Sequence, residues 1–477
     1  MRRSTESASA ASYSPNAMLL HLDGTTRTAI AAFVLLTIAV FIGGCSEWPP
    51  PADRAEAMAE AVLPSVSASQ DNPEMRVYVD CSLSMAPYTS ADASPYRTVL
   101  QATDNLFGGT SSFFCFGFPS KTESQVVQPV RTGALLSPDA YGYVNNDYGI
   151  LFQNFLPDDG QPSTTHIVMS DGVQSSPTGG ARFARIVDAI GAWVHEGGIF
   201  ALLTYRTPYR GTYYNEVPQP GQVTYNCGDR PIHLFGFFPS PDALDSFVEV
   251  METEVTADYR IRVGLPAARL MPTDELADAP IPSGGLHKPR DVTSYLTPDV
   301  TGDVNAGIVT GGGSLTSLTY GVRFDPEAAP WSTVEADVRR QIFSSADVTL
   351  TAHQIANWAG GPADTLSVTP LPDDGIRLMS DPEWAVVNDS LVTYQFPVDV
   401  SFPKSGRNHV ALDVQLGLSP NGANRLVPGS LSTQVDADPR ACSRTLNLGR
   451  TLGAILRNHY IVGRSLTFLQ WTTGAGS

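Results

Sequence analysis

Strand and helix patterns alternate along the chain from residue 74 to about residue 258. Apolar runs of strand length lie at 75–79, 112–118, 165–170, 199–205 and 232–237. Between them, apolar residues recur at the i, i+3, i+4 and i+7 spacing of helices, as at Phe183, Ile186, Val187 and Ile190. This order predicts an α/β domain with a doubly wound, mostly parallel sheet that helices cover on both faces.

Oxygen-bearing side chains follow two of these predicted strands. Asp80, Ser82 and Ser84 come at the end of the first strand, and Asp171 follows the strand at 165–170. Ligands of such sheets bind beyond the carboxyl ends of the strands. Carboxylate and hydroxyl oxygens suit Mg²⁺, or Ca²⁺ or Mn²⁺, whereas zinc and copper favour thiolate or imidazole ligands. We therefore expect a divalent metal site at this edge of the sheet.

With its strands and helices in this order, the stretch 74–258 resembles a von Willebrand factor A-type domain. The Asp-x-Ser-x-Ser motif of that family is matched by Asp80, Ser82 and Ser84, and its strand ending in Asp-Gly is matched at Asp171. The resemblance implies a metal-ion-dependent adhesion site, in which the ion keeps open positions for an acidic side chain of a protein ligand.

The chain departs from that family in the loop before the helix predicted to begin near Tyr148. The threonine that the family supplies there is missing, and the loop has Asn146 and Asp147 instead. Asn146 could give the ion a carbonyl oxygen, and Asp147 a third carboxylate that would make the site net negative and repel an acidic partner. Asp147 could equally be the N-cap of the helix. A degenerate domain that holds no metal stays an alternative.

The connection from residue 206 to residue 230 is long for a link between two strands. It contains Tyr209, Tyr213 and Tyr214 together with several prolines and glycines. Long loops in compact domains are commonly functional, and tyrosine gives a broad contact area at small entropic cost. We expect these tyrosines to border the metal site and to help select the partner. An ordinary surface excursion is the alternative.

Four of the five cysteines lie in the predicted domains. Cys81 and Cys115 fall in predicted core strands, where buried, unpaired thiols are expected. Cys227 and Cys442 lie in polar, turn-rich surroundings. A disulfide between these two is the pairing we expect in an oxidising compartment.

The N-terminal residues differ in kind from the rest. Arginines precede an uncharged, mainly apolar run, 28–44, that ends at Cys45. This resembles a bacterial lipoprotein signal, which implies removal of residues 1–44 and attachment of a lipid to Cys45. A transmembrane anchor is the alternative. Residues 45–73, rich in proline, alanine and serine, predict a tether that lifts the domains off the membrane.

The chain is acidic, with a formal net charge of −18. Removing residues 1–44 takes away three basic and two acidic side chains and leaves 27 against 46, or −19. Nucleic-acid binding is not expected, because contacts with phosphate need clustered lysine and arginine. We expect the protein to meet the membrane through its lipid anchor.

Helix patterns become scarce after residue 258. Strand patterns lie at 315–324, 348–352, 394–402 and 409–418, and the last of these alternates between apolar and other residues. One helix near 448–456 and one strand at 466–469 follow. Residues 259–477 are therefore predicted to form a mainly β, sandwich-like second domain.

Together these features predict a non-enzymatic bacterial envelope protein, held by its lipid and facing the periplasm or the exterior, that binds a protein ligand through Mg²⁺ or a similar ion. One alternative is a scaffold subunit of an envelope assembly whose metal site is vestigial. Another is a metal-dependent hydrolase with Asp147 or Asp171 as its base. His166 and His233 lie inside strand patterns, where buried and hydrogen-bonded side chains are expected.

Overall fold

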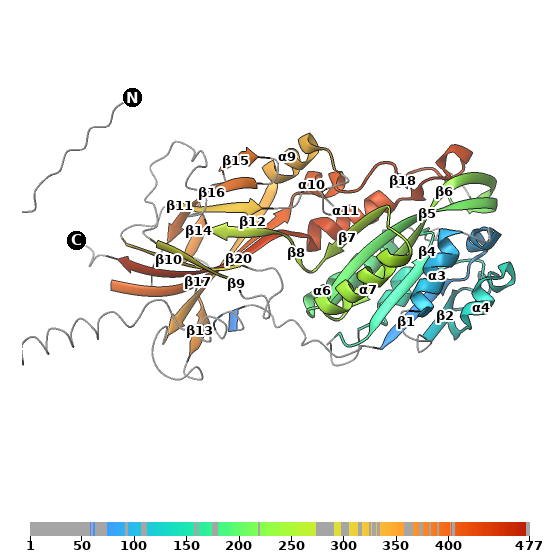
Figure 1. Ribbon diagram of the computed structural model, residues 1–477, viewed down its shortest axis with the longest axis horizontal. Coiled ribbons are helices and arrows are strands. Elements are labelled where there is room, and N and C mark those ends of the chain that lie inside the picture. Colours follow the sequence, from blue (N-terminus) through green and yellow to red (C-terminus); the bar gives the residue numbers. More distant parts are fainter. Residues whose placement is uncertain are drawn as a thin grey trace, which may run out of the picture. The chain divides into compact units, whose positions relative to one another are not determined.

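The computed structural model shown in Figure 1 describes most of the chain after residue 73. The described residues are 58, 61–62, 74–90, 94–105, 112–156, 160, 162–173, 180–217, 220–272, 291–296, 305–312, 317–323, 326, 331, 334–356, 366–371, 375–380, 383–388, 391–400, 402 and 406–473. The predicted signal at 1–44, the lipidation site Cys45 and nearly all of the tether at 45–73 lie outside them.

The first sheet has seven strands in the order β3-β2-β1-β4-β6-β5-β7. Its central strands β2, β1 and β4 are parallel, whereas β3 on one side and β6, β5 and β7 on the other run antiparallel to their neighbours. The sheet is therefore mixed, with a parallel centre. The strands are β1 (Met75–Asp80), β2 (Ser112–Gly117), β3 (Val126–Pro129), β4 (Thr165–Ser170), β5 (Ile199–Asn215), β6 (Gly221–Phe238) and β7 (Tyr259–Val263).

The predicted loop at 206–230 is instead the outer part of a long hairpin formed by β5 and β6. These strands pair antiparallel from Ile199 with Phe238 out to Asn215 with Gly221, with one irregularity between Thr207 and Tyr209. A hairpin returns the chain antiparallel, whereas a parallel neighbour needs a longer crossover. This connection explains why the sheet is parallel only at its centre (Figure 1).

Helices cover both faces of this sheet, as the sequence predicted. Helices α5 (Tyr148–Phe152) and α6 (Gly180–His195) share one apolar core with Tyr78 and Val168 of the central strands. Helices α3 (Pro95–Asn105) and α7 (Pro241–Glu254) share the other core with residues such as Val77. Because successive strand residues point to opposite faces, each apolar strand supplies both cores.

The second half of the described chain is mainly β. Eleven of its described strands form one hydrogen-bonded sheet. They are β8 (Pro266–Pro272), β9 (Asp291–Leu296), β10 (Asn305–Gly312), β11 (Ser317–Arg323), β12 (Ala346–Ala356), β13 (Ser367–Pro370), β14 (Ile376–Leu378), β15 (Glu383–Asn388), β16 (Leu391–Val400), β17 (Gly406–Leu418) and β20 (Ile461–Thr473). Helices α9 (Ala336–Ser344), α10 (Pro420–Arg425) and α11 (Leu448–His459) accompany them.

A segment near the C-terminus returns to the first sheet. Residues 431–446, which we call the cover segment, contain the short strands β18 (Ser432–Thr433) and β19 (Thr445–Leu446). The cover segment makes hydrogen bonds and a disulfide with the hairpin. The predicted boundary at 258/259 also falls before β7, which is the last strand of the first sheet. The two halves of the sequence are thus interleaved in space.

Candidate functional site

The ends of β1 and β4 bring the predicted site residues together. The two strands are adjacent and parallel, with Val79 opposite Met169, so that Asp80 and Ser170 reach the same level. Asp171 is the residue directly after β4, and it is buried like Asp80. Pairing of parallel strands therefore does what the sequence predicted: it places two distant acidic residues at one edge of the sheet.

Asp80 is buried and its carboxylate is surrounded by donors. Its Oδ1 accepts a hydrogen bond from the backbone N–H of Ser82 at 2.9 Å. Its Oδ2 lies within hydrogen-bond distance of Asn146 Nδ2 at 2.6 Å, Ser170 Oγ at 2.8 Å and Tyr148 OH at 3.1 Å. A carboxylate without exposed surface needs such partners, because burial removes its hydration.

Asp171 is buried too and faces an arginine of the hairpin. Its Oδ1 accepts from the backbone N–H of Val173 at 3.0 Å, and its Oδ2 lies 3.4 Å from Arg230 Nη2. Arg230 is 1% exposed, so this ion pair has almost no contact with solvent. The second acidic residue of the site therefore already has a cationic partner within the chain.

Three tyrosine rings surround the guanidinium of Arg230. Its Cζ atom lies 4.3 Å from the ring centroid of Tyr213, 5.0 Å from that of Tyr209 and 5.1 Å from that of Tyr225. Aromatic faces attract cations at such distances, and the attraction grows when water is excluded. Arg230 also donates to the backbone carbonyl of Cys442 at 3.1 Å. We call these three rings the tyrosine cage.

The cover segment closes the site from the outside. Asp436 accepts hydrogen bonds from Tyr213 OH at 2.9 Å and from the backbone N–H of Val217 at 2.8 Å. Thr445 donates to the backbone carbonyl of Asp171 at 3.2 Å and lies 2.8 Å from His233 Nε2. The side chains of His233 and Thr445 leave no room for a Cβ at Gly172, whose φ is +72°.

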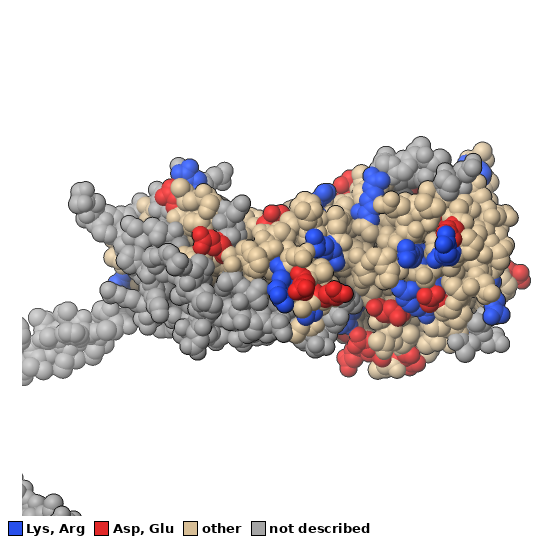
Figure 2. All heavy atoms as spheres, turned by 90° about the horizontal axis from the view of Figure 1, so that it is seen from above, with Lys and Arg blue, Asp and Glu red and all other residues tan. Residues whose placement is uncertain are grey.

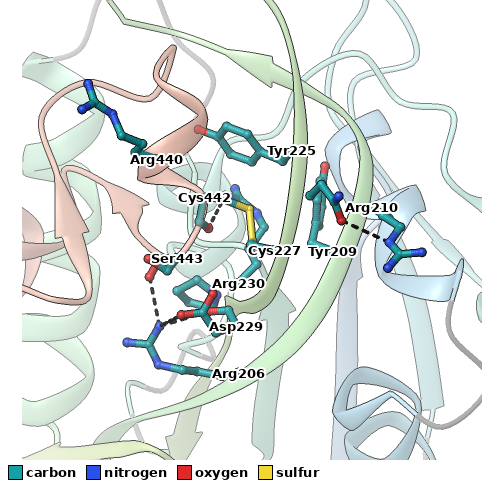
Figure 3. Close-up of a disulfide and its surroundings, with 12 residues drawn as sticks. Arg206, Tyr209, Arg210, Tyr225, Cys227, Asp229, Arg230, Arg440, Cys442 and Ser443 are labelled. Carbon is teal, nitrogen blue, oxygen red and sulfur yellow. Dashed lines mark hydrogen bonds and ion pairs between the residues drawn. A yellow bond between two sulfur atoms is a disulfide. The ribbon is translucent and has the colours of Figure 1, made fainter.

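A disulfide joins the cover segment to the hairpin beside this contact. Cys227 and Cys442 are bonded, and their Cα atoms lie 6.2 Å apart. Figure 3 shows the bond next to Arg230, with Arg206 reaching across to the backbone carbonyl of Ser443 at 3.1 Å. The pairing favoured by the surroundings of these two cysteines is thus present in the structure.

Burial shifts the pKa of both carboxyl groups upward. Burial first, and then the negative charge of Asp171, raise the pKa of Asp80 to about 6, although the hydrogen bonds from Ser82 and Ser170 act in the opposite direction. Burial also raises the pKa of Asp171, with Arg230 opposing the shift. Desolvation penalises the charged form in each case, and the negative charge of Asp171 adds to the shift at Asp80.

The structure brings some of the predicted ligands together, but it gives Asp147 a different role. Ser82 Oγ and Ser84 Oγ lie 3.2 Å apart, and Asn146 bonds directly to Asp80. Asp147 instead is the N-cap of α5, where its Oδ1 accepts from the backbone N–H of Ile150 at 3.2 Å. Its Oδ2 lies 3.9 Å from Arg185 Nη2. Of the two roles left open for Asp147, the structure has the helix cap.

The predicted partner-binding tyrosines need a correction. Tyr209 and Tyr213 are buried, with exposed fractions of 0% and 1%, because they hold Arg230. Tyr209 also donates to the backbone carbonyl of Ser84 at 2.9 Å, which ties the hairpin to the motif loop. Tyr214 is half-buried on the hairpin. Two of these three rings therefore stabilise the site from inside.

Cys81 and Cys115 are buried as predicted, but the expectation of unpaired thiols is wrong, because the two residues form a disulfide. Their Cα atoms lie 5.6 Å apart, and both belong to the core under α3 and α7. β1 and β2 are direct neighbours, with Val79 opposite Cys115, so that Cys81 lies just beyond the paired residues. Each strand alone shows a buried cysteine, and only the pairing of the strands brings the sulfurs together.

A divalent ion does not fit the site as it is arranged. The oxygens of Asp80 lie within hydrogen-bond distance of four donors, and an ion bound there would have to displace them. The guanidinium of Arg230 already neutralises Asp171 and would repel a second cation beside it.

Neither Arg230 nor the cover segment was predicted from the sequence to be part of the site. The sequence does contain one signal of the tyrosine cage. Tyr205, Thr207, Tyr209 and Tyr213 are two or four positions apart, as expected for side chains on one face of a strand, and all four are buried. No comparable signal marks Thr445, whose role depends on a contact across 274 positions of sequence.

Comparisons with known proteins give no relative: no family model, curated protein or solved structure matches this chain. In the part of the chain that the structure describes, none of the helices has both the length and the apolar character needed to cross a membrane.

Proposed function

We propose that this protein is a non-enzymatic, lipid-anchored envelope protein whose α/β domain is a scaffold that binds other envelope proteins without using a metal ion. One observation carries the proposal. The two acidic residues that would define an adhesion site, Asp80 and Asp171, have no exposed surface, and both are satisfied by groups of the chain.

Access to the site supports this choice over adhesion through an ion. A partner carboxylate would have to reach an ion beneath the cover segment, which the Cys227–Cys442 disulfide fastens to the hairpin. It would also have to replace Arg230 at Asp171. Breaking a buried ion pair by removing one partner is strongly unfavourable, because the remaining charge is left without compensation. The closed site is therefore better suited to supporting the sheet edge than to capturing a ligand.

The two histidines of the first sheet give no support for an enzyme. His166 stacks on Phe155 with the ring centroids 4.3 Å apart, and His233 lies between Thr204 and Thr445. Burial lowers the pKa of each to about 3, so that both are neutral near neutral pH. Neither faces a reacting group, and the proposal accordingly assigns them a structural role.

The charge of the chain supports protein partners over nucleic acid. The net charge of −18 works against phosphate backbones. On the face drawn in Figure 2, acidic and basic side chains lie interspersed and do not form one extended basic surface. Mixed charge of this kind is typical of a polar protein interface, whereas electrostatic binding of a polyanion needs a basic surface.

Adhesion through a divalent ion is the second candidate. It is favoured by the convergence of Asp80, Ser82, Ser84 and Asp171 at one sheet edge. In that function the cover segment and Arg230 would have to leave the site before an ion and a partner could enter. The two candidates therefore make opposite predictions about chelators.

The deciding experiment is crosslinking of the tagged full-length chain in its own bacterium, followed by capture of the crosslinked partners and quantitative mass spectrometry. We expect the same partners in millimolar Mg²⁺ and in EDTA. Ser82→Ala, a matched variant that removes a hydroxyl ligand but none of the donors to Oδ2 of Asp80, should also leave capture unchanged. Loss of capture both in EDTA and in S82A would favour adhesion through the ion instead.

A further inference from the structure

The mismatch between the site and a divalent ion has a specific cause in Arg230. Asp80 and Asp171 are buried acidic residues at the ends of adjacent parallel strands, and the negative charge of Asp171 acts on Asp80, so this edge of the sheet attracts positive charge. The guanidinium supplies one positive charge there, and four hydrogen-bond donors serve the other carboxylate. The chain thus places its own cation beside Asp171, one of the residues predicted to hold the metal.

We propose that Arg230 is a built-in replacement for the metal ion, and that the site beneath it is a latent divalent-cation site that binds metal only when this guanidinium is removed. The inference concerns the site alone and does not rest on the proposed scaffold function.

The surroundings of Arg230 indicate a position built to hold a buried cation. Withdrawing a guanidinium from water is unfavourable unless charge and aromatic faces replace the water. Asp171 supplies the charge at 3.4 Å, the tyrosine cage supplies three faces, and the backbone carbonyl of Cys442 accepts one N–H. A guanidinium stacks on aromatic rings and spreads its donors in a plane, as this set of partners requires.

Two long-range links hold the guanidinium in place. Tyr209 bonds to the backbone carbonyl of Ser84, and Tyr88 OH donates to the backbone carbonyl of Pro231, 2.7 Å away and next to Arg230. Both links join the hairpin to the loop that contains the motif. On the other side, Tyr225 hydrogen-bonds to the backbone carbonyl of Asp436 in the cover segment. The arginine is therefore fixed from the motif side and from the cover side.

The motif oxygens remain suitable for a cation once the arginine is gone. Ser82 Oγ and Ser84 Oγ lie 3.2 Å apart in the loop after β1, at the edge of the sheet where Asp171 follows β4. Hydroxyl and carboxylate oxygens are ligands that Mn²⁺ and Mg²⁺ accept. Loss of the guanidinium would leave Asp171 as a buried charge without a counter-ion. Binding of a divalent ion would then be favourable, because the ion compensates that charge.

The test uses the full-length protein, Mn²⁺ as the probe and two readouts, electron paramagnetic resonance of bound Mn²⁺ and the melting temperature. We expect the wild type to bind no Mn²⁺ at the site and to melt at the same temperature in Mn²⁺ and in EDTA. Arg230→Gln, which keeps a donor for Asp171 but removes the charge, should bind one Mn²⁺ at least about tenfold more tightly than the wild type. Its melting temperature should rise when Mn²⁺ is added.

Two further variants make the test decisive. Arg230→Lys keeps the positive charge and should remain insensitive to Mn²⁺. The double variant R230Q/D171N removes both charges and should be insensitive as well, although it should melt above R230Q measured in EDTA. If R230Q folds only in the presence of Mn²⁺, that dependence supports the proposal.

Three results would overturn the proposal: binding of one Mn²⁺ by the wild type, a folded R230Q that ignores Mn²⁺, or an R230Q that fails to fold even with Mn²⁺ while R230Q/D171N folds. Each of these results would leave the partner-capture experiment unaffected, so failure of this inference can be told apart from failure of the scaffold proposal.

Discussion

Asp80 combines complete burial with an unusual number of donors. Its two oxygens accept from one backbone N–H and lie near three side-chain donors, so the ionised form keeps most of the hydrogen bonding that water would provide. The pKa of the group is nevertheless raised to about 6, because desolvation and Asp171 outweigh these bonds. The carboxyl group therefore changes its ionisation near pH 6.

This shift predicts how stability depends on pH. The folded protein holds the Asp80 proton more tightly than the unfolded chain does, since the unfolded pKa is about 3.9. The stabilising contribution is complete below about pH 4 and is lost as pH rises through about 6, a change of about 3 kcal/mol in the free energy of unfolding. Urea denaturation between about pH 4.5 and pH 8 measures it.

Asp80→Asn is the control, because an amide of the same shape cannot titrate. We expect the wild type to gain stability relative to D80N as the pH falls from about 8 to about 5. The comparison removes the contributions of surface carboxylates, which both proteins share. Parallel pH profiles for the two proteins would show that Asp80 titrates as it does in the unfolded chain.

At the scale of elements, sequence pattern predicted five of the seven strands of the first sheet, missing β3 and β7, and it predicted that Asp80 and Asp171 lie at one edge. Both follow from local information: apolar periodicity gives the elements, and the rule for parallel strands puts their carboxyl ends together. The antiparallel pairing of β6 with β4 did not follow, because the outer part of the β5–β6 hairpin, residues 206–230, contains prolines and glycines that also suit a loop.

The cover segment shows why the rest of the site could not be predicted from the sequence. Asp436, Cys442 and Thr445 lie more than 200 positions from their partners Tyr213, Cys227 and the Asp171 carbonyl. Their own sequence is turn-rich and carries no periodicity that names a partner. Such contacts are set by how the whole chain folds back. Only the cysteines indicated one of them, because four remain, an even number, when Cys45 is set aside.

The two disulfides should differ in their effect on stability. Cys227–Cys442 spans 215 positions and Cys81–Cys115 spans 34. In the chain-entropy account a longer closed loop restricts the unfolded state more, so the double variant C227S/C442S should lose about 1.5 kcal/mol more stability than C81S/C115S. Denaturation of the two variants under the same conditions measures the difference.

A second readout locates the effect in the fold. Limited proteolysis of C227S/C442S should begin in the cover segment, since the disulfide is its covalent link to the hairpin. In C81S/C115S the cover segment should remain protected. Equal protection of the cover segment in both variants would mean that the hydrogen bonds of Asp436 and Thr445 hold it without the disulfide.

At the scale of the whole molecule, charge and anchoring have to be considered together. A protein with a net charge of −18 is repelled by anionic lipid, so nothing in its overall electrostatics holds it at a membrane. The proposed envelope location therefore depends on the lipid expected at Cys45. A single acyl chain gives only marginal binding, whereas the diacylglyceryl group implied by the lipoprotein resemblance, with its two chains, gives stable attachment.

Cys45→Ser separates this lipid anchor from every other route to the membrane. We expect the wild type to incorporate radiolabelled palmitate and to stay with the membrane fraction in molar salt, because buried acyl chains are not screened by ions. C45S should carry no label and move to the soluble fraction. If C45S stayed with the membrane, a transmembrane anchor in residues 28–44 would be the better explanation. Release of the wild type by salt alone would instead mean that ionic contacts hold it, against the repulsion that its charge predicts.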